Sequence, residues 1–202
     1  MFYKKLDFSF SVCPNKTSAI LLKSCDINAA IEKLLKETIG LNHLWGVSTI
    51  VVQESIYKKF YANTIFYLRQ YDDDDDNKSF IKNDDNSQLI SQEAVNTGSE
   101  VIHGNGIKIL FNYQNEEIQP DLPVIKVLVC RTAKEGVNLV NNLSNSLGTS
   151  VWSEVSSEAL EVADTLNSNN VWINCHGVSS PFVPIHPGSS GNCILGGSEG
   201  EI

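Results

Sequence analysis

The stretch at residues 124–174 decides the fold, and it reads VIKVLVCRTAKEGVNLVNNLSNSLGTSVWSEVSSEALEVADTLNSNNVWIN. Its opening part, residues 124–130, is an apolar run typical of a buried strand. Thr132 then precedes a helical pattern that extends to about Asn142 and places Val137 and Val140 inward. Because threonine is a preferred N-cap residue, we predict that Thr132 caps this helix.

The rest of this stretch repeats the alternation of strand and helix. A short strand is predicted at 150–153, an amphipathic helix at 156–166 and a last strand at 171–174. The helix carries its apolar residues at Ala159, Leu160, Ala163 and Leu166, and the strands carry Trp152 and Trp172, which we predict to be core residues. Strands that alternate with helices form a mostly parallel sheet covered by those helices.

The chain upstream shows the same order of elements. A buried strand is predicted at 17–22, and Asp26 caps a helix whose apolar residues are Ile27, Ala30, Ile31, Leu34 and Leu35. A β-branched strand at 47–53 and a helix at 55–70 follow.

A short helix ending near Gly98 comes before two further strands, at 100–103 and 107–113, joined by a turn at 104–106. We therefore predict an α/β fold, with an open, mostly parallel sheet and flanking helices.

Composition excludes several classes of protein. The 202 residues are enough for one domain, and the net charge of -9 argues against nucleic acid as a partner. No apolar stretch approaches the ~20 residues of a membrane span, and the N-terminus lacks a signal-peptide core. The five cysteines are odd in number and irregularly spaced, so they do not form a disulfide framework. A cytoplasmic protein is expected.

The acidic segment YDDDDDNKSFIKNDDNSQ, residues 71–88, interrupts the pattern and predicts a mobile surface loop. Asp72, Asp74 and Asp76 have the alternation of a calcium-binding loop. However, Asn77 stands where such a loop needs glycine, and Asn83 stands where it needs a bidentate glutamate. We therefore predict a solvated loop and no metal site.

Two separated segments carry a resemblance to a known family. The first comprises KTSAILLKSCDINAAIEKLL and VSTIVVQESIYKKF, within residues 16–60. The second comprises VIKVLVCRTAKEGVNLVNN, TSVWSEVSSEALEVADTL, VWINCHGVSSPFVP and GGSEGE, within residues 124–201. Both resemble the catalytic domain of aldehyde dehydrogenases, and RTAKE, SVWSE and VWINCHG resemble family 16 in particular. A generic α/β protein is the alternative, but it does not account for shared order and tetrapeptides in two segments.

The resemblance implies NAD(P)-dependent oxidation of aldehydes through a covalent adduct on a cysteine thiolate. It places that thiol just before the predicted strand at 47–53, where the chain reads Asn42-His43-Leu44-Trp45. Counting back from Gln53 puts Leu44 on the cysteine position, and no cysteine occurs between Cys25 and Cys130. The catalytic thiol is therefore expected to be lost.

Other family positions are changed as well. The resemblance puts Val12 where the family has its base glutamate, and Gln119 where a glutamate holds the nicotinamide ribose. Asp121 replaces an aromatic residue. Only 15 residues precede Lys16, and no glycine-rich phosphate loop follows an early strand, so the cofactor domain is expected to be missing and no cofactor is predicted for this chain.

The other cysteines are poor candidates for a replacement catalytic thiol. Cys175 and His176 are neighbours on an extended segment, so their side chains point in opposite directions and the histidine is poorly placed to activate the thiol. A zinc site from Cys175, His176, His186 and Cys193 lacks a metal-binding spacing. We predict a structural role for Cys175.

We divide the chain into an irregular N-terminus at 1–15, a catalytic-domain-like region at 16–175 and a Gly/Ser/Pro-rich tail at 176–202. Three functional interpretations remain open. The chain is a non-catalytic interaction or scaffold module that binds a protein partner or a second copy. Alternatively, it is a fragment of an active oxidoreductase whose catalytic module lies elsewhere in a longer chain, or a truncated product that does not fold stably.

Overall fold

The computed structural model describes residues 17–39, 45–72, 92, 94–96, 98–104, 107–113, 124–143, 147–168 and 170–178. Within them, one seven-stranded sheet has the order β3-β4-β5-β2-β1-β6-β7. The strands are β1 (Thr17–Leu21), β2 (Val47–Gln53), β3 (Glu100–Gly104), β4 (Ile107–Phe111), β5 (Val124–Cys130), β6 (Thr149–Trp152) and β7 (Val171–Ile173). The helices are α1 (Ile27–Ile39), α2 (Glu54–Asp72), α4 (Ala133–Asn141) and α5 (Ser156–Asp164).

The sheet is mostly parallel, as predicted. All neighbouring strands from β4 to β7 pair in parallel, and only β3 pairs antiparallel, with β4. Parallel strands begin at one edge of a sheet and end at the other. We call these the amino edge, which holds the first residues of β1, β2 and β6, and the carboxyl edge, which holds their last residues.

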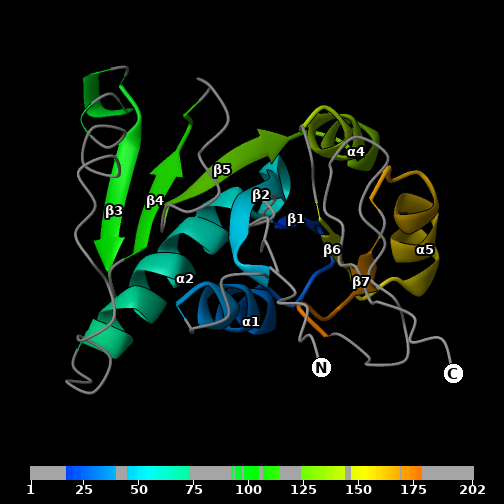
Figure 1. Cartoon of the computed structure of the whole chain (residues 1–202), viewed down its shortest axis with the longest axis horizontal. Helices are drawn as coiled ribbons and strands as arrows, with labels where there is room; N and C mark the ends of the chain where they lie inside the picture. Colours follow the sequence, from blue (N-terminus) through cyan, green and yellow to red (C-terminus); the bar gives the residue numbers. More distant parts are fainter. Residues whose placement is uncertain are drawn as a thin grey trace, which may run out of the picture.

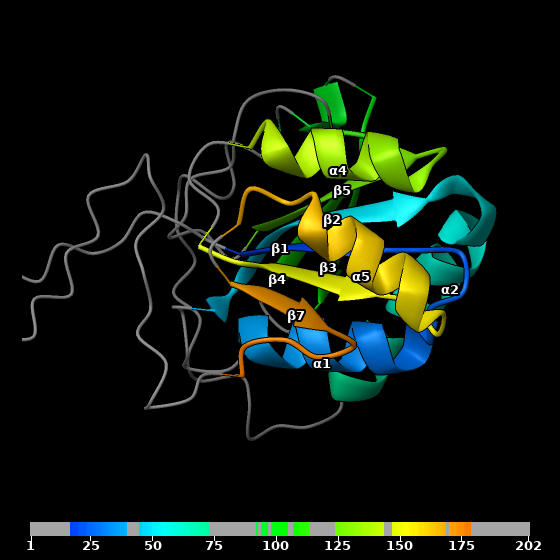
Figure 2. The same cartoon turned by 90° about the vertical axis from the view of Figure 1, so that its right-hand side faces the viewer.

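Helices cover both faces of the sheet (Figures 1 and 2). On one face, α1 and α2 pack against alternate strand residues such as Leu21, Val52 and Phe111. On the other face, α4 and α5 pack against the intervening residues, including Ile20 and Val51. Because strand side chains alternate between the faces, two apolar layers arise from continuous apolar strands. This two-sided burial explains why β1 and β2 lack polar alternation in sequence.

The predicted helix starts are confirmed by their capping bonds. The carboxylate Oδ1 of Asp26 accepts from the amides of Asn28 at 3.0 Å and Ala29 at 3.2 Å. The hydroxyl of Thr132 accepts from the amide of Glu135 at 3.2 Å. Each bond satisfies an amide that has no partner inside its helix.

Several predicted boundaries were wrong. Gly104 belongs to β3, opposite Ile107, and is not in the turn. The strand β4 stops at Phe111, because Asn112 has a φ of 60°. The helix α2 extends to Asp72, and so includes the first residues of the predicted acidic loop.

The inward face predicted for the helix at 156–166 needs a correction. Leu160 is 56% exposed, whereas Ala159 and Val162 are the buried residues of α5. Residues three apart lie on the same face of a helix, so Ala159 and Val162 mark the face of α5 that packs against the sheet. Leu160 lies to the side of that face and is therefore exposed.

Other predictions fall on residues outside the described part of the chain. These are residues 73–88 of the acidic loop, which hold all the calcium-like residues except Asp72, and the terminal segments 1–15 and 179–202 of the proposed domain division. Within the described residues, no helix has the length and apolarity needed to span a membrane.

Candidate functional site

The amino edge of the sheet brings together the residues nearest to the predicted thiol loop. Trp45 lies two residues before the start of β2, and Thr17 is the first residue of β1. After β7 the chain reverses direction at Asn174, which has a φ of 52°. The Asn174 side chain holds this reversal, because Oδ1 accepts from the Ser153 amide at 2.9 Å and Nδ2 donates to the Ser153 carbonyl at 2.8 Å. The reversal returns residues 175–178 toward the amino edge.

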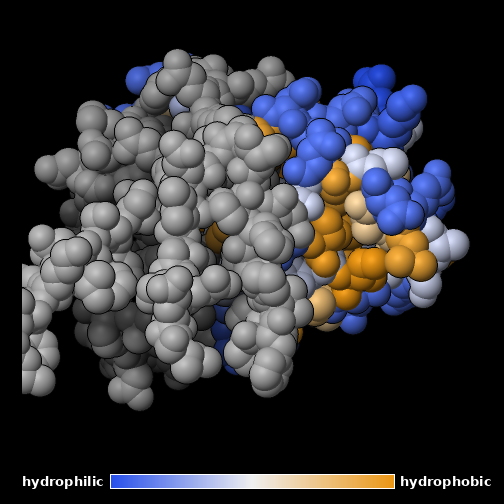
Figure 3. Space-filling view, turned by 45° about the vertical axis from the view of Figure 1, so that its right-hand side comes forward, coloured by the Kyte–Doolittle hydropathy of each residue, from blue (hydrophilic) through white to orange (hydrophobic). Residues whose placement is uncertain are grey.

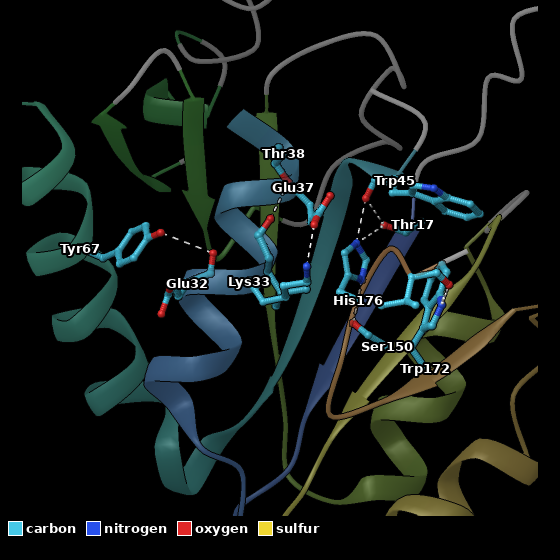
Figure 4. Close-up of polar contacts among 12 residues, drawn as sticks. Thr17, Glu32, Lys33, Glu37, Thr38, Trp45, Tyr67, Ser150, Trp172 and His176 are labelled. Atoms are coloured by element: carbon cyan, nitrogen blue, oxygen red, sulfur yellow. Dashed lines mark hydrogen bonds and ion pairs between the residues drawn. The ribbon is translucent and has the colours of Figure 1, made fainter. Parts of the chain in front are cut away.

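His176 is the centre of this edge (Figure 4). Its side chain is fully buried, and its Nε2 lies 2.8 Å from the carbonyl oxygen of Trp45 and 3.1 Å from the hydroxyl of Thr17. Its Nδ1 lies 3.2 Å from the hydroxyl of Ser150, on β6. One imidazole therefore connects the starts of β1 and β2, the strand β6 and the segment after β7.

The donors and acceptors of this network define the tautomer of His176. A carbonyl only accepts, so Nε2 carries the proton and donates to Trp45. In the neutral ring Nδ1 then accepts from the Ser150 hydroxyl, which itself accepts from Nε1 of Trp152 at 3.1 Å. Every polar atom of the ring is thus used in a structural bond.

Burial keeps this imidazole neutral. Desolvation lowers the pKa of His176 below its usual value of 6.5, and the charge of Lys33 acts in the same direction. The hydrogen bond to the Trp45 carbonyl and the charge of Glu37 oppose the shift without overcoming it. Lys33 and Glu37 form a salt bridge of 2.7 Å on α1, and their charges act on the pKa of His176 in opposite directions.

Aromatic rings pack around the histidine. The ring centroids of Trp172 and His176 are 5.2 Å apart, and those of Trp172 and Trp45 are 5.1 Å apart with perpendicular planes. Cys175 is half-buried against Trp45, Leu147 and Trp172. Trp152 and Trp172 are buried, which confirms the prediction that they are core residues.

Cys175 and His176 do not form a nucleophile–base pair. Both ring nitrogens of His176 are bonded to Thr17, Trp45 and Ser150, and none of their partners is a sulfur atom. Cys175 packs against Trp45, Leu147 and Trp172. None of the hydrogen bonds of His176 therefore reaches the Cys175 thiol, and the opposite directions of the two side chains stay a prediction.

The other described thiols lie at the carboxyl edge. Burial is the largest cause that raises the pKa of Cys25 to about 12, and it also raises the pKa of Cys130 to about 11. Cys130 pairs with Gln53 at the end of the seven-residue strand β2, so it is roughly 20 Å from the start of that strand, where Trp45 lies. A thiol that remains protonated is a poor nucleophile, and these two are also far from the predicted thiol loop.

Most sequence-predicted site residues fall outside the described part of the chain. Asn42, His43 and Leu44 of the thiol loop are among them, as are Val12, Gln119 and Asp121. Trp45 is the described member of the loop, and it is 3% exposed with its carbonyl turned toward His176. Among the described residues, no group of three or more His, Cys, Asp or Glu side chains is placed to hold a metal ion.

Sequence reasoning missed the network itself. Thr17, Trp45 and Ser150 were assigned only to strands or loops, yet they are the partners of His176. The sequence separations are 159, 131 and 26 residues, so no local spacing links them. A polar histidine after an apolar strand was the one available indication, and it does not identify a partner.

The fold matches solved aldehyde dehydrogenase structures at low sequence identity. An NAD-dependent aldehyde dehydrogenase from Sinorhizobium meliloti matches with a TM-score of 0.71 and 19% identity over 88% of this chain and 40% of that one. An NADP-dependent glyceraldehyde-3-phosphate dehydrogenase from Bacillus halodurans complexed with NADP matches with a TM-score of 0.69 and 18% identity, over 83% and 39%. The chain has an aldehyde dehydrogenase fold.

A sequence-family model supports the same superfamily. Residues 106–188 match the model described as the aldehyde dehydrogenase family, from the start of β4 to beyond β7. An indole-3-acetaldehyde dehydrogenase complexed with NAD+ matches at a TM-score of 0.65 and 21% identity, over 82% of this chain and 39% of that one. This chain spans about two fifths of the length of the aldehyde dehydrogenases it matches.

Proposed function

We propose that this chain is a non-catalytic member of the aldehyde dehydrogenase superfamily that acts as an interaction or scaffold module. The observation that carries the proposal is that the amino edge has neither a cysteine at the family's thiol position nor a histidine that is free to act as a base. The resemblance places the family thiol next to Trp45, where the sequence has Leu44. The nearby imidazole of His176 is buried, neutral and bonded on both nitrogens, so it supports the fold and is not available as a base.

The chemistry of the described thiols supports the same proposal. Aldehyde oxidation in this superfamily needs a thiolate at the amino edge. Cys25 and Cys130 are at the carboxyl edge with raised pKa values, and Cys175 is packed among aromatic rings. No cysteine in the sequence lies between Cys25 and Cys130, which includes the whole loop before β2.

Two hydroxyls at the amino edge, those of Thr17 and Ser150, are engaged in internal hydrogen bonds and do not fit a nicotinamide cofactor as free partners. Such a cofactor needs free donors and acceptors for its ribose and amide groups. The hydroxyl of Thr17 already contacts the Trp45 carbonyl at 3.0 Å and the Gly46 carbonyl at 3.2 Å, and Ser150 is held between His176 and Trp152. We therefore derive no hydride-transfer step for this chain.

A second candidate is a part of a longer aldehyde oxidoreductase whose catalytic module lies elsewhere. The observation in its favour is that the chain spans only 39–40% of matched dehydrogenases. The motifs RTAKE, SVWSE and VWINCHG favour a family 16-like protein within either candidate. In cells, an immunoblot band much larger than 22.3 kDa would support this second candidate, and a band at 22.3 kDa would support the first.

A reducing compartment such as the cytoplasm fits both candidates. The described cysteines Cys25, Cys130 and Cys175 are all free thiols. Free thiols persist where the environment is reducing, whereas exported proteins tend to pair them.

The enzymatic test is NADH formation from short-chain aldehydes by the purified chain, with NAD or NADP supplied. We expect no turnover, and a cooperative heat-denaturation curve from the same sample would show that the inactive protein is folded. The matched variant is Cys175→Ser. Turnover in the wild type that this variant abolishes would overturn the proposal and make Cys175 the nucleophile.

A further inference from the structure

A short segment after β7 returns to the amino edge, and it has a single buried anchor. This segment comprises residues 175–178, and we call it the strap. His176 is fully buried, whereas Cys175 and Gly177 are partly exposed and Val178 is 60% exposed. The strap begins at β7, on the side of the molecule where hydrophobic residues reach the surface (Figure 3). It therefore runs over the surface and is fixed to the interior by one imidazole.

Every hydrogen bond that the described residues make to the strap involves a side chain. The last main-chain bond before it joins the Asn174 amide to the Val151 carbonyl at 2.9 Å, and no main-chain pair among the described residues includes the strap. The strap is held by the ring of His176 and by Nε1 of Trp172, which donates to the Val178 carbonyl at 2.9 Å. Release of these few contacts would free the strap and leave the hydrogen bonds of the sheet intact.

The strap also passes close to Glu37, on α1. Asn174 and Gly177 have φ values of 52° and 67°, so the chain turns sharply on both sides of His176. A Cβ atom on Gly177 would lie 3.5 Å from Oε2 of Glu37. The other oxygen of this carboxylate, Oε1, pairs with Lys33 at 2.7 Å. Oε2 is therefore the oxygen that faces the strap, one residue beyond the imidazole.

The buried position of His176 suits a neutral ring and not a charged one. Nδ1 accepts from the Ser150 hydroxyl, so a proton on Nδ1 would set two donors against each other until that hydroxyl turns away. The described residues of β1, β6 and β7 present hydroxyls and an indole to the ring, and the segment before β2 presents a carbonyl. The charged groups that act on it, Lys33 and Glu37, both belong to α1 (Figure 4). An imidazolium at this position would contact no carboxylate among the described residues, and a buried charge without a partner is costly.

We propose that the strap is a pH-operated latch, in which protonation of His176 draws the imidazolium out of the amino edge toward Oε2 of Glu37. The departure of the strap uncovers the rings of Trp45 and Trp172. The imidazole takes up one proton from water, no bond between heavy atoms changes, and the strands of the sheet stay paired. The released imidazolium gains a carboxylate partner and contact with water, which the buried ring lacks. The latch does not depend on the proposed function, since it needs neither a catalytic thiol nor a cofactor.

Acidification favours the open strap. Burial lowers the pKa of His176 while the strap is closed, and exposure lets the ring bind a proton more readily. The open form therefore binds more protons than the closed form, and the ratio of open to closed molecules rises by at most about tenfold for each pH unit below 6.5. The strap is closed at neutral pH and begins to open as the pH falls below 6.5.

Cys175 reports the opening, because it packs against Trp45 and Trp172 while the strap is closed. Its reaction with dithiodipyridine is followed on the full chain between pH 8 and pH 5 by peptide mass spectrometry, and each rate is divided by that of glutathione at the same pH. Any thiol loses its reactive thiolate in acid, and the division removes this trend together with the response of the reagent. We expect the normalised rate at Cys175 to rise about tenfold from pH 6.5 to pH 5, while the rates at Cys25 and Cys130 stay unchanged.

Variants test each part of the latch. His176→Gln cannot be protonated, so its normalised Cys175 rate should be independent of pH, whatever its level. Glu37→Gln removes the carboxylate that receives the imidazolium, and the rise at pH 5 should be about twofold to fivefold smaller, because a partly exposed charge pair contributes modestly. Glu32→Gln removes the same charge from an exposed position of α1 and should keep the wild-type profile.

Three results would overturn the inference. The first is a normalised Cys175 rate that stays flat in the wild type or rises equally in His176→Gln. The second is a rise accompanied by faster hydrogen exchange throughout β1 and β6, which would show that the whole sheet unfolds in acid. The third is a wild-type profile in Glu37→Gln, which would exclude this carboxylate as the receiving group. All are measured without aldehyde or NAD, so failure of the latch is distinguishable from failure of the proposed function.

Discussion

The two edges of the sheet use their polar residues in different ways. At the amino edge, His176, Thr17, Trp45 and Ser150 come from four separate segments and meet in a buried network. At the carboxyl edge, the polar contacts are more exposed and secure neighbouring loops, as when Gln53 Oε1 accepts from the Lys23 amide at 2.7 Å. Ligands of α/β proteins commonly bind at the carboxyl edge. In this chain the family resemblance places the catalytic thiol at the amino edge instead. There, the buried imidazole of His176 is hydrogen-bonded to Thr17, Trp45 and Ser150.

This difference predicts which edge contributes more to the free energy of unfolding. A buried network that joins distant segments is lost as a unit, whereas an exposed contact between neighbouring loops can be replaced by water. Substitutions at the amino edge should therefore cost more stability than substitutions at the carboxyl edge.

The largest effect is expected for His176→Ala. The substitution removes a fully buried ring that packs on Trp172 and bonds to Trp45 and Ser150. We expect the free energy of unfolding to fall by about 3 kcal/mol, from lost packing and broken hydrogen bonds together. Urea denaturation followed by tryptophan fluorescence measures the change.

His103→Ala is the matched control, because His103 is an exposed residue of β3. It should change the free energy of unfolding by less than about 0.5 kcal/mol. Equal losses in the two variants would contradict the assignment of His176 as the link between the segments.

The next effect is expected for Gly148→Ala, just before β6. A methyl group at this position would lie 2.6 Å from the Trp172 ring and 3.1 Å from the Asn170 carbonyl, both too close without movement. We expect a loss of about 2 kcal/mol, since an extra carbon in a tightly packed region forces its neighbours to shift. Gly98→Ala is the contrasting variant, because the new methyl meets nothing within 4 Å and the cost there comes from its φ of 79°.

In Gly148→Ala, near-ultraviolet circular dichroism should show a changed Trp172 environment, and in Gly98→Ala it should not. An unchanged tryptophan spectrum in the Gly148 variant would mean that the aromatic cluster accommodates the methyl group without moving. That outcome would contradict the description of the amino edge as closely packed.

The fold was largely predictable from sequence, and the site was not. Local patterns located the caps at Asp26 and Thr132 and the strand β5, because a cap and an apolar run depend on residues close in sequence. Leu160 was misplaced because helical spacing alone does not say which apolar stripe meets the sheet. The His176 network needed the assembled sheet, since three of the segments meet only after β6 pairs with β1 and β1 with β2.

Acidification should weaken the amino edge in a defined pH range. The pKa of His176 is lowered in the folded protein, so below its usual value of 6.5 the unfolded chain binds more protons than the folded chain. The stability contributed by the neutral ring is therefore complete above pH 6.5 and is lost as the pH falls from 6.5 toward the folded pKa. The loss should be smaller than in His176→Ala, because a protonated ring keeps its volume and packing.

The pH dependence is measured as the free energy of unfolding between pH 8 and pH 5, in wild type and in His176→Gln. The variant cannot be protonated, so its curve should lack the loss that begins near pH 6.5. Lys33 and Glu37 are the charged neighbours that bear on the ring, and both are present in the two proteins. If the free energy of unfolding falls in parallel in the two proteins, the titration of His176 is not its cause. The loss of stability would then be assigned to carboxylates.

The smallest effect is expected at the carboxyl edge, for Thr132→Ala. The variant loses the hydroxyl that accepts from the Glu135 amide, although Glu135 still accepts from the Arg131 amide at 2.8 Å and holds the start of α4. We expect a loss of about 1 kcal/mol, typical of a helix N-cap.

Ser157→Ala, at an exposed position in the first turn of α5, should be close to neutral. Urea denaturation of both variants tests the comparison. A loss for Thr132→Ala as large as that for His176→Ala would show that the two edges contribute equally, since the single exposed cap would then matter as much as the buried link among four segments.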